Sequence, residues 1–393
     1  MKKAIIPALL ATLLFAGISF SEEVYKACVK WDTTWPDPEK TDAGLEILSG
    51  VEHFTIFTGS RELGMFNHGP IVHYYNNKLF VTWFSHDKYE GGPGTRALFA
   101  FSEDMKHWSK TQVLIDSIGK MAPKNQPGVG IYPIFKEVNG RLYTTATVKE
   151  VTEWVKRESG AITPVHHDLP RLIRYISPEG IPGKDTYWLS ESIPPGHEKD
   201  GILPYTMAKN KKILNDITKL KEMRNEHKKL YSFPESSDKG TKFCEPTYFF
   251  RPDGKEVGLY RDDSRSMRLY AALRNESKGN WSMAYKTNIP DSPSKCVAGN
   301  LPDGRAFLIG NNIDRLWLRD PLILSISEDG INFTKAYTIR CGAPQCMEKN
   351  PGDHKGPGFQ YPNAIVVDDT LWVTYSIGKE QIGISKISID LLK

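Results

Sequence analysis

Two histidines flank the apolar runs of FNHGPIVHYYNNKLFVTWFSHDK, which spans residues 66–88. Histidine can move protons near neutral pH, so His68 and His86 are candidates for acid–base chemistry. If the Asn-Asn pair forms the tip of a two-residue hairpin, His68 lies opposite Ser85 and beside His86. The spacing therefore predicts that both imidazoles lie at the open end of one hairpin.

The same pairing arithmetic brings more polar residues to the open ends of other hairpins. It places Glu245 opposite Asp262 and beside Arg261. It also pairs Tyr132 with Thr147, Lys295 with Asn312, and Tyr361 with Ser376. If the strands surround one axis, we expect a single channel mouth to gather His68, His86, Tyr132, Glu245, Arg261, Lys295 and Tyr361.

This mixture of side chains suits an acidic sugar. Arginine can hold a carboxylate with two parallel hydrogen bonds, and aromatic faces can cover pyranose rings. A structural interpretation stays open for each group. Glu245 and Arg261 would then be an ion pair that ties two strands, His68 would end a strand, and His86 would belong to an exposed loop.

The elements that position these residues form a weak internal repeat, in which an apolar run, a tight polar turn and a second apolar run follow one another. Many short apolar runs between Gly, Asn, Asp and Pro turns predict an all-β chain. Some hairpins lead to a third run that ends in a Ser-x-Asp turn, as in SEDMKHW and SEDGINF, where Asp104 and Asp329 should organise the turn. The five copies cover residues 69–83, 132–146, 245–260, 296–310 and 361–375.

Four-stranded antiparallel units repeated around a centre predict a β-propeller, with a β-sandwich as the alternative. The 372 residues that follow residue 21 of the 393-residue chain, at about 40–50 per blade, predict seven blades, with six still open. One helical insertion is expected at 205–232, because apolar residues recur at helical spacing in KNKKILNDITKLKEMRNEHKK. Its apolar stripe consists of Ile213, Ile217, Leu220 and Met223.

The first 21 residues, MKKAIIPALLATLLFAGISFS, have the pattern of a signal peptide, so we expect a secreted or periplasmic protein with one propeller domain over 22–393. The net charge of +4 argues against a nucleic-acid partner. No membrane association is expected after cleavage of the signal peptide. Cys341 and Cys346, in CGAPQC, are close enough in sequence for a disulfide-closed loop. We expect a monomer without a cofactor or catalytic metal, and a structural calcium ion stays open.

The chain resembles the sialidase superfamily of β-propellers with Asp-box, or BNR, repeats. The resemblance rests on the two Ser-x-Asp turns and on TNIPDSPSK, LPDGR, RDPL, FQYP and YSIGKE, and it covers nearly all of residues 66–390. Within the superfamily these segments are similar to a branch that includes ulvan lyases and α-L-rhamnosidases that release rhamnose linked to glucuronate. Sialidases use an arginine triad, with one arginine in an Arg-Ile-Pro element, and a tyrosine–glutamate nucleophile. This chain contains no Arg-Ile-Pro.

The resemblance implies roles for particular residues. In the rhamnosidase-like relatives a histidine on the first matching hairpin is catalytic, and FNHGP offers His68. In the lyases two histidines, a tyrosine and an arginine act together, and His68, His86 and Arg261 match three of these. Glu245 stands where the lyase tyrosine is expected, and Tyr248 should point to the other face of the strand.

We therefore predict an exported glycoside hydrolase that cleaves next to an acidic sugar in a polysaccharide or oligosaccharide. His68 would be the general acid or base, Glu245 would assist it, Arg261 would bind the carboxylate, and His86 would support catalysis. The substrate-binding residues would be Tyr132, Lys295, Arg319, Tyr361 and Asn363. The alternatives are a lyase acting by β-elimination at a uronate and a glycan-binding propeller without catalysis.

Overall fold

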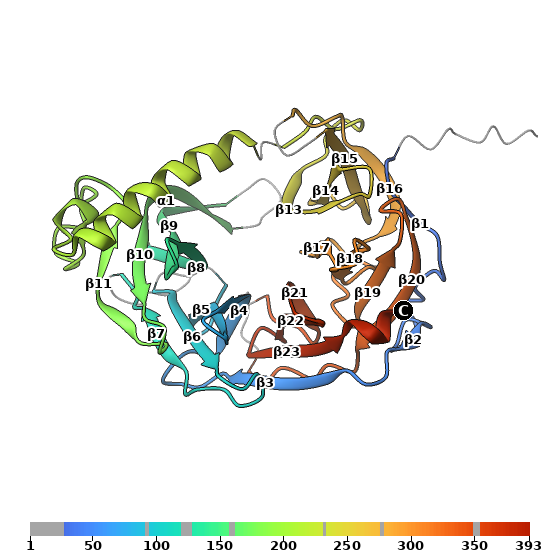
Figure 1. Ribbon diagram of the computed structural model, residues 1–393, viewed down its shortest axis with the longest axis horizontal. Coiled ribbons are helices and arrows are strands. Elements are labelled where there is room, and N and C mark those ends of the chain that lie inside the picture. The colour runs from blue at the N-terminus through green and yellow to red at the C-terminus, as the bar shows by residue number, and fades with distance from the viewer. Residues whose placement is uncertain are drawn as a thin grey trace, which may run out of the picture.

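Five β-sheets surround a common axis in the computed structural model of the chain (Figure 1). The structure describes residues 27–90, 94–118, 128–156, 162–230, 233–275, 279–348 and 354–393, and the expected signal peptide lies outside these ranges. The β-propeller is therefore confirmed, but the expectation of seven or six blades is wrong.

Each blade begins with its innermost strand and adds strands outward through antiparallel pairs. Blade one contains β4 (Phe66–Tyr75), β5 (Lys78–His86), β6 (Arg96–Ser102) and β7 (Gln112–Ile115). Blade two contains β8 (Gly128–Val138), β9 (Arg141–Lys156), β10 (Ile162–Ile176), β11 (Pro182–Trp188) and the short β12 (Leu203–Pro204). Blade three contains β13 (Phe243–Phe250), β14 (Lys255–Asp262), β15 (Arg268–Asn275) and β16 (Tyr285–Pro290).

The last two blades recruit strands from the start of the chain. Blade four contains β17 (Val297–Asn300), β18 (Ala306–Gly310), β19 (Leu322–Ser327) and β20 (Asn332–Arg340), with β1 (Lys30–Trp31) and β2 (Glu46–Ile47) parallel to β20. Blade five contains β21 (Phe359–Val367), β22 (Thr370–Ile377), β23 (Gln381–Ser388) and, outermost, β3 (Glu52–Thr58). Because β3 pairs with β23, the N-terminal strand closes the ring and covers an edge that would otherwise be unpaired. The chain then ends in a 3₁₀ turn, η2 (Ile389–Leu392).

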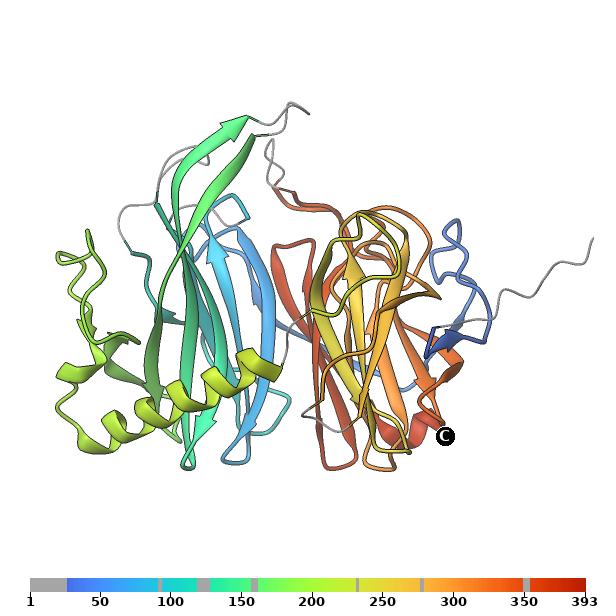
Figure 2. The same cartoon turned by 90° about the horizontal axis from the view of Figure 1, so that it is seen from above.

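The insertions between strands explain the wrong blade count. β9 and β10 continue past the other strands as a long hairpin arm (Figure 2). After β12 comes a further insertion with η1 (Tyr205–Met207) and the helix α1 (Lys211–Leu230). The predicted number of blades came from dividing the chain length by an average blade length, which counts the residues of these insertions as if they formed blades. The five sequence repeats, by contrast, correspond one to one with the five hairpins nearest the axis.

The core lies between neighbouring sheets, because alternate side chains of each strand pack against the next blade. Val81 and Leu98 of blade one, for example, share a cluster with Trp372 and Ile384 of blade five. All four side chains are buried. At about 25 cal/mol per Å² of apolar surface, such contacts between blades supply the main favourable term for the ring.

The two Ser-x-Asp turns have the structural role that the sequence predicts. Asp104 accepts hydrogen bonds from the backbone N–H groups of Lys106 and His107 and from the Ser102 hydroxyl. Asp329 accepts the equivalent bonds from Ile331, Asn332 and Ser327. Both carboxylates close a turn between the third and fourth strands of a blade.

The insertion helix is fixed to blade two by one buried face. Ile217 and Leu220 are buried in a cluster with side chains of β9 and β10, whereas Met223 is 45% exposed and so does not belong to that face. Asp216 is buried and receives hydrogen bonds from Arg141, Tyr143 and Asn139. None of the helices in the described part of the chain is long and apolar enough to cross a membrane.

The loop after β20 contains the two cysteines whose pairing the sequence leaves open. Cys341 and Cys346 are not joined by a disulfide. The loop is held instead by Glu380, whose carboxylate accepts backbone N–H bonds from Met347 and Glu348 and pairs with the ammonium of Lys355 at 2.9 Å.

Candidate functional site

The innermost strands of blades one, three and five share a bulge next to a proline. The regular pairing with the second strand breaks after His68, Cys244 and Gln360 and resumes three residues later, while the partner strand advances by only two. The residue before each proline has positive φ: Gly69 at 62°, Glu245 at 48° and Tyr361 at 55°. Positive φ costs a residue other than glycine about 1–3 kcal/mol, and bulges commonly re-aim side chains near functional sites.

These bulges shift the predicted pairs by about one residue. His68 pairs with Phe84 rather than Ser85, and Phe66 pairs with His86. Arg261 pairs with Cys244, Asp262 with Phe243, and Ser376 with Gln360. Lys295 precedes its strand, which starts at Val297. Only the pair Tyr132–Thr147 has the predicted register, because β8 pairs regularly with β9 along its length.

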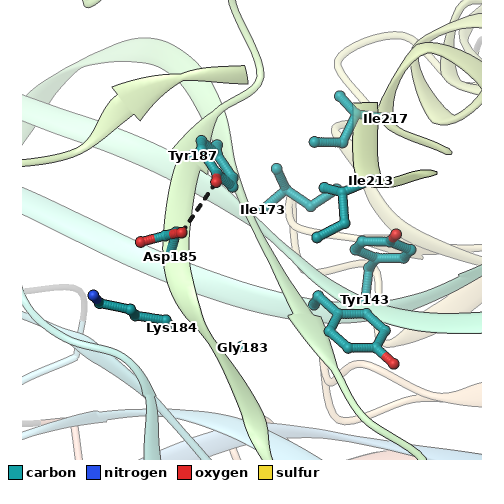
Figure 3. A pocket seen from close by; sticks show the side chains of 9 residues that line it. Tyr143, Ile173, Gly183, Lys184, Asp185, Tyr187, Ile213 and Ile217 are labelled. Atoms are coloured by element: carbon teal, nitrogen blue, oxygen red, sulfur yellow. Dashed lines mark hydrogen bonds between the residues drawn. The ribbon is translucent and has the colours of Figure 1, made fainter. Parts of the chain in front are cut away.

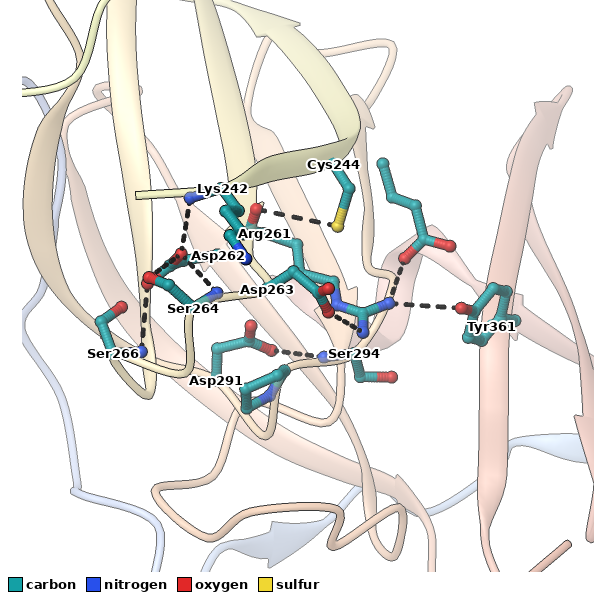
Figure 4. A network of polar contacts seen from close by, with 12 residues as sticks. Lys242, Cys244, Arg261, Asp262, Asp263, Ser264, Ser266, Asp291, Ser294 and Tyr361 are labelled. Carbon is teal, nitrogen blue, oxygen red and sulfur yellow. Dashed lines mark hydrogen bonds and ion pairs between the residues drawn. The ribbon is translucent and has the colours of Figure 1, made fainter. Parts of the chain in front are cut away.

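Tyr361, Glu245 and Arg261 form one polar network (Figure 4). Nη1 of Arg261 donates to Oε2 of Glu245 at 2.6 Å and to the Tyr361 hydroxyl at 3.2 Å. Nη2 of Arg261 donates to Asp263 at 3.1 Å. Burial and the neighbouring Glu245 carboxylate raise the pKa of the Tyr361 phenol. The phenol is therefore neutral at ordinary pH, with a carboxylate beside it that can take its proton.

His68 is fully buried and leans on Tyr361, with the two ring centroids 4.2 Å apart. Its Nδ1 lies 2.7 Å from the Ser376 hydroxyl, which donates its own hydrogen to the carbonyl of Gln360 at 3.2 Å. Nδ1 must then carry the proton, and the lone pair is on Nε2, which has no hydrogen-bond partner among the described residues. Burial, with nearby Lys379, Arg319 and Lys295, holds the pKa of His68 well below its usual range.

Two cationic side chains near Tyr361 have no carboxylate partner in the described part of the chain. Arg319 donates through Nη2 to the Pro293 carbonyl at 3.0 Å, while its buried Nη1 has no partner among the described residues. The ammonium of Lys295 lies 6.0 Å from the centre of the Tyr361 ring. By contrast, Lys379 is neutralised by Glu90 at 2.6 Å. The site therefore has positive charge available for an anion.

Asp291 is the most unusual carboxyl group of the site. It is buried beneath Arg261 (Figure 4), accepts only the Ser294 N–H at 3.3 Å through Oδ1, and leaves Oδ2 without a partner among the described residues. Burial raises its pKa to about 7, against the opposing effect of the Ser294 hydrogen bond and of Arg261 and Arg319. Its charge can therefore change at neutral pH.

The structure does not give every predicted residue a place in this network. Nδ1 of His86 accepts the backbone N–H groups of Lys88 and Tyr89 at 3.0 and 2.9 Å, so it organises its own loop. Asn363 accepts the N–H of Val72 and ties blade five to blade one. Tyr132 packs edge-on against Phe84, which in turn contacts the ring of His68. Tyr248 stacks on Trp281, away from the network.

Sequence reasoning missed Asp291 and Ser376. Both lie in segments that the resemblance singled out, TNIPDSPSK and YSIGKE. Nothing in the sequence alone distinguishes a buried carboxyl group from a turn aspartate, because burial here depends on two neighbouring blades. Within the described ranges, no group of three or more His, Cys, Asp or Glu side chains could hold a metal ion.

Comparisons with known proteins give a consistent result for the fold. The BNR repeat-like domain family matches residues 193–373, and a family described as an N-terminal β-propeller matches residues 28–129. A solved structure titled "Sialidase" superposes with a TM-score of 0.72 at 18% identity, over 92% of this chain and 35% of the other. The fold is therefore a β-propeller similar to those of sialidases.

More distant sialidase propellers also match. The NanB sialidase from Streptococcus pneumoniae, in a complex with a chlorobenzyl ammonioethanesulfonate, has a TM-score of 0.51 at 11% identity, over 86% of this chain and 71% of the other. NanB with Optactamide has a TM-score of 0.52 at 10% identity, with the same coverage. A search of curated proteins finds no match. This chain spans about a third of the length of the protein titled "Sialidase".

Proposed function

We propose that the protein is a glycoside hydrolase that acts on an acidic sugar through a covalent intermediate on Tyr361. The observation that carries this proposal is the shared contact of Arg261 with the Tyr361 hydroxyl and the Glu245 carboxylate. Most glycosidases use two carboxyl groups, but sialidases use a tyrosine nucleophile. The Tyr361–Glu245 arrangement has the components of that second chemistry.

The order of proton and bond changes follows from the ionisation states. Glu245 takes the phenol proton while the Tyr361 oxygen forms a bond to the anomeric carbon. The bond from that carbon to the leaving oxygen breaks, and the leaving oxygen gains a proton from solvent at the mouth. A water molecule then displaces the tyrosine oxygen and releases its extra proton to solvent, directly or through Nε2 of His68, while the proton held by Glu245 returns to Tyr361. Arg261 lies beside both oxygens and so stabilises the negative charge that passes between them.

The carboxylate of the substrate would be held mainly by Arg319 and Lys295. Arg261, which the sequence favoured for this role, already pairs with Glu245 and Asp263. Within the described ranges Arg319 keeps a buried Nη1 without a hydrogen-bond partner, and leaving such a donor unsatisfied costs about 1–3 kcal/mol. A carboxylate next to the anomeric carbon also gives a reason for a neutral nucleophile, since a carboxylate nucleophile would be repelled by it.

His68 has a narrower role than the sequence suggests. Its low pKa and its protonated Nδ1 leave it neutral, so it cannot donate a proton from Nε2. It can accept one, from a substrate hydroxyl or from the attacking water. We therefore assign it as a hydrogen-bond acceptor and base rather than a general acid.

A trapping experiment tests the proposal directly. Fluorinated sialosides and uronides with good leaving groups should form a stable adduct, which peptide mass spectrometry should locate on Tyr361. In parallel, ulvan, arabinogalactan and sialylated glycans should be tested as substrates. Hydrolysis with no adduct on Tyr361, or an adduct on another residue, would refute the assigned nucleophile.

Elimination is the second candidate, and Nε2 of His68 favours it, because this nitrogen is neutral and has no hydrogen-bond partner in the part of the chain that the structure describes. A lyase would use this base to remove the proton next to a uronate carboxylate that the cations neutralise. Its product is an unsaturated uronate that absorbs in the ultraviolet, which hydrolysis does not make. Binding of the same glycans without any product would instead support a glycan-binding propeller.

A further inference from the structure

Two loops of neighbouring blades meet beside the proposed site. The loop of residues 263–267 follows β14 directly after Arg261, and the loop of residues 311–321 joins β18 to β19. Trp317 lies in the second loop, where it is 50% exposed and has a positive φ of 64°. A large residue rarely adopts this strained backbone conformation unless its surroundings hold it there.

The indole is placed by two guanidinium groups. Cζ of Arg265, from blade three, lies 5.6 Å from the centre of the Trp317 ring, and Cζ of Arg319, from blade four, lies 5.5 Å from it. Cation–π contacts at this range are attractive and restrict the ring to one position. Arg319 is also the residue with the unpartnered, buried Nη1 next to Tyr361. The exposed indole of Trp317 therefore adjoins the cationic side of the site, where Arg319 lies.

We propose that Trp317 is the platform for the second sugar ring of the substrate, the one linked to the acidic sugar. Aromatic side chains cover the apolar face of a pyranose at little entropic expense, because they have few rotatable bonds. Arg319 would hold the carboxylate of the first ring, and the indole of the neighbouring Trp317 would stack on the sugar ring of the leaving group. This inference rests on the proposed function, since it assumes that an acidic sugar occupies the network around Tyr361.

The test measures binding, so that it does not depend on turnover. Calorimetry on the Tyr361→Phe protein would compare the methyl glycoside of N-acetylneuraminic acid with sialyllactose, and glucuronic acid with a glucuronate-containing disaccharide. We expect each larger sugar that binds to do so about tenfold more tightly than the corresponding monosaccharide. Trp317→Ala should abolish that gain and leave the monosaccharide affinity unchanged, while Trp317→Phe should keep most of it.

Phe250 provides the matched control. It is 46% exposed and lies at the turn of the β13–β14 hairpin, whereas Arg261 lies at the other end of that hairpin. Phe250→Ala should therefore change neither affinity. The inference is overturned if Trp317→Ala weakens both ligands equally, which would mean that Trp317 only supports Arg319, or if it weakens neither. Failure of all four sugars to bind the Tyr361→Phe protein would instead refute the proposed function, and this inference with it.

Discussion

Arg261 and Tyr361 meet across the axis of the propeller: Nη1 of Arg261, on blade three, lies 3.2 Å from the hydroxyl oxygen of Tyr361, on blade five. The same nitrogen donates to Glu245 at 2.6 Å. Their strands are not adjacent in the sheets, so only closure of the ring brings these residues together. The contact gives each of the three groups a different role. The guanidinium of Arg261 donates to both oxygens, while the Tyr361 phenol and the Glu245 carboxylate remain able to exchange a proton.

Replacement of Tyr361 by phenylalanine removes the nucleophile and little else. We expect Tyr361→Phe to lower kcat by about a thousandfold or more, comparable with the loss of other activated nucleophiles. The melting temperature should stay close to that of the native protein, because the ring can still pack against His68.

Tyr132→Phe is the matched control, since that half-buried tyrosine packs against Phe84 near the site and is not one of the residues of the network. It should keep most of the activity. Equal losses in the two variants, measured by initial rates on a cleaved substrate, would contradict the assignment of Tyr361.

Asp291 should make substrate binding weaken as pH rises through neutrality. Its pKa is about 7, so it is neutral at pH 6 and mostly charged at pH 8. The ionised carboxylate lies near Arg261 and Arg319 and competes with the substrate carboxylate for them. We expect KM to rise about tenfold over this interval, equivalent to about 1.4 kcal/mol, and the rise to disappear in Asp291→Asn. A KM profile unchanged by the substitution would refute this role.

The same carboxyl group should affect stability in a defined direction. Because its pKa in the folded state is raised above the ordinary value of 3.8, the folded protein binds more protons than the unfolded chain between about pH 4 and pH 7. The free energy of unfolding attributable to Asp291 therefore falls as pH rises through this window, by at most about 4 kcal/mol. Denaturation at pH 8 should show Asp291→Asn to be more stable than the native protein, with little difference at pH 4.

Much of the fold could be predicted from the repeat, and the wrong number of blades has a local cause. The hairpin turns and the Ser-x-Asp turns depend on residues close in sequence, and both occur where they were predicted. The number of blades depends on how much chain lies outside the blades. The β9–β10 arm and the helix α1 carry regular apolar patterns of their own, so chain length alone could not separate them from a blade.

The site was predicted less completely, because its geometry depends on irregular backbone. Simple pairing put His68 next to His86, but the bulge at Gly69 places His68 opposite Phe84 and leaves His86 with backbone partners. Glu245 and Tyr361 were expected at the mouth, but both have the positive φ of a bulge, which regular strand pairing does not predict. A proline after each was the available signal, since bulges are one of the few places where a strand accepts proline.

Ser376 should act on catalysis through the tautomer of His68. Without its hydroxyl, Nδ1 of His68 loses the acceptor that fixes its proton, and the Nε2–H form becomes populated. We expect Ser376→Ala to lower kcat by about tenfold and Ser376→Thr to restore most of it, by analogy with other residues that orient a histidine. Nitrogen NMR of the imidazole should show the change of tautomer. Loss of activity with the native tautomer retained would assign Ser376 to packing instead.

Asp216 offers a stability test that leaves the site untouched. Burial alone would raise its pKa, but hydrogen bonds from Arg141, Tyr143 and Asn139 outweigh burial and lower it. Its contribution to stability is therefore present at neutral pH and is lost as pH falls through the lowered pKa. Asp216→Ala leaves the Arg141 charge and the buried Tyr143 hydroxyl without their acceptor, and we expect it to destabilise the protein by about 3–5 kcal/mol.

The destabilisation should begin where α1 meets blade two. The apolar pocket there is lined by Ile213 and Ile217 of the helix and by Tyr143, Ile173 and Tyr187 of the sheet (Figure 3). Hydrogen exchange should show early opening of α1 in Asp216→Ala, while kcat at a temperature well below unfolding stays native, because the buried face of α1 packs on blade two, whereas the network around Tyr361 lies on blades three and five. Loss of activity in a protein that remains folded would show that α1 is coupled to the site around Tyr361.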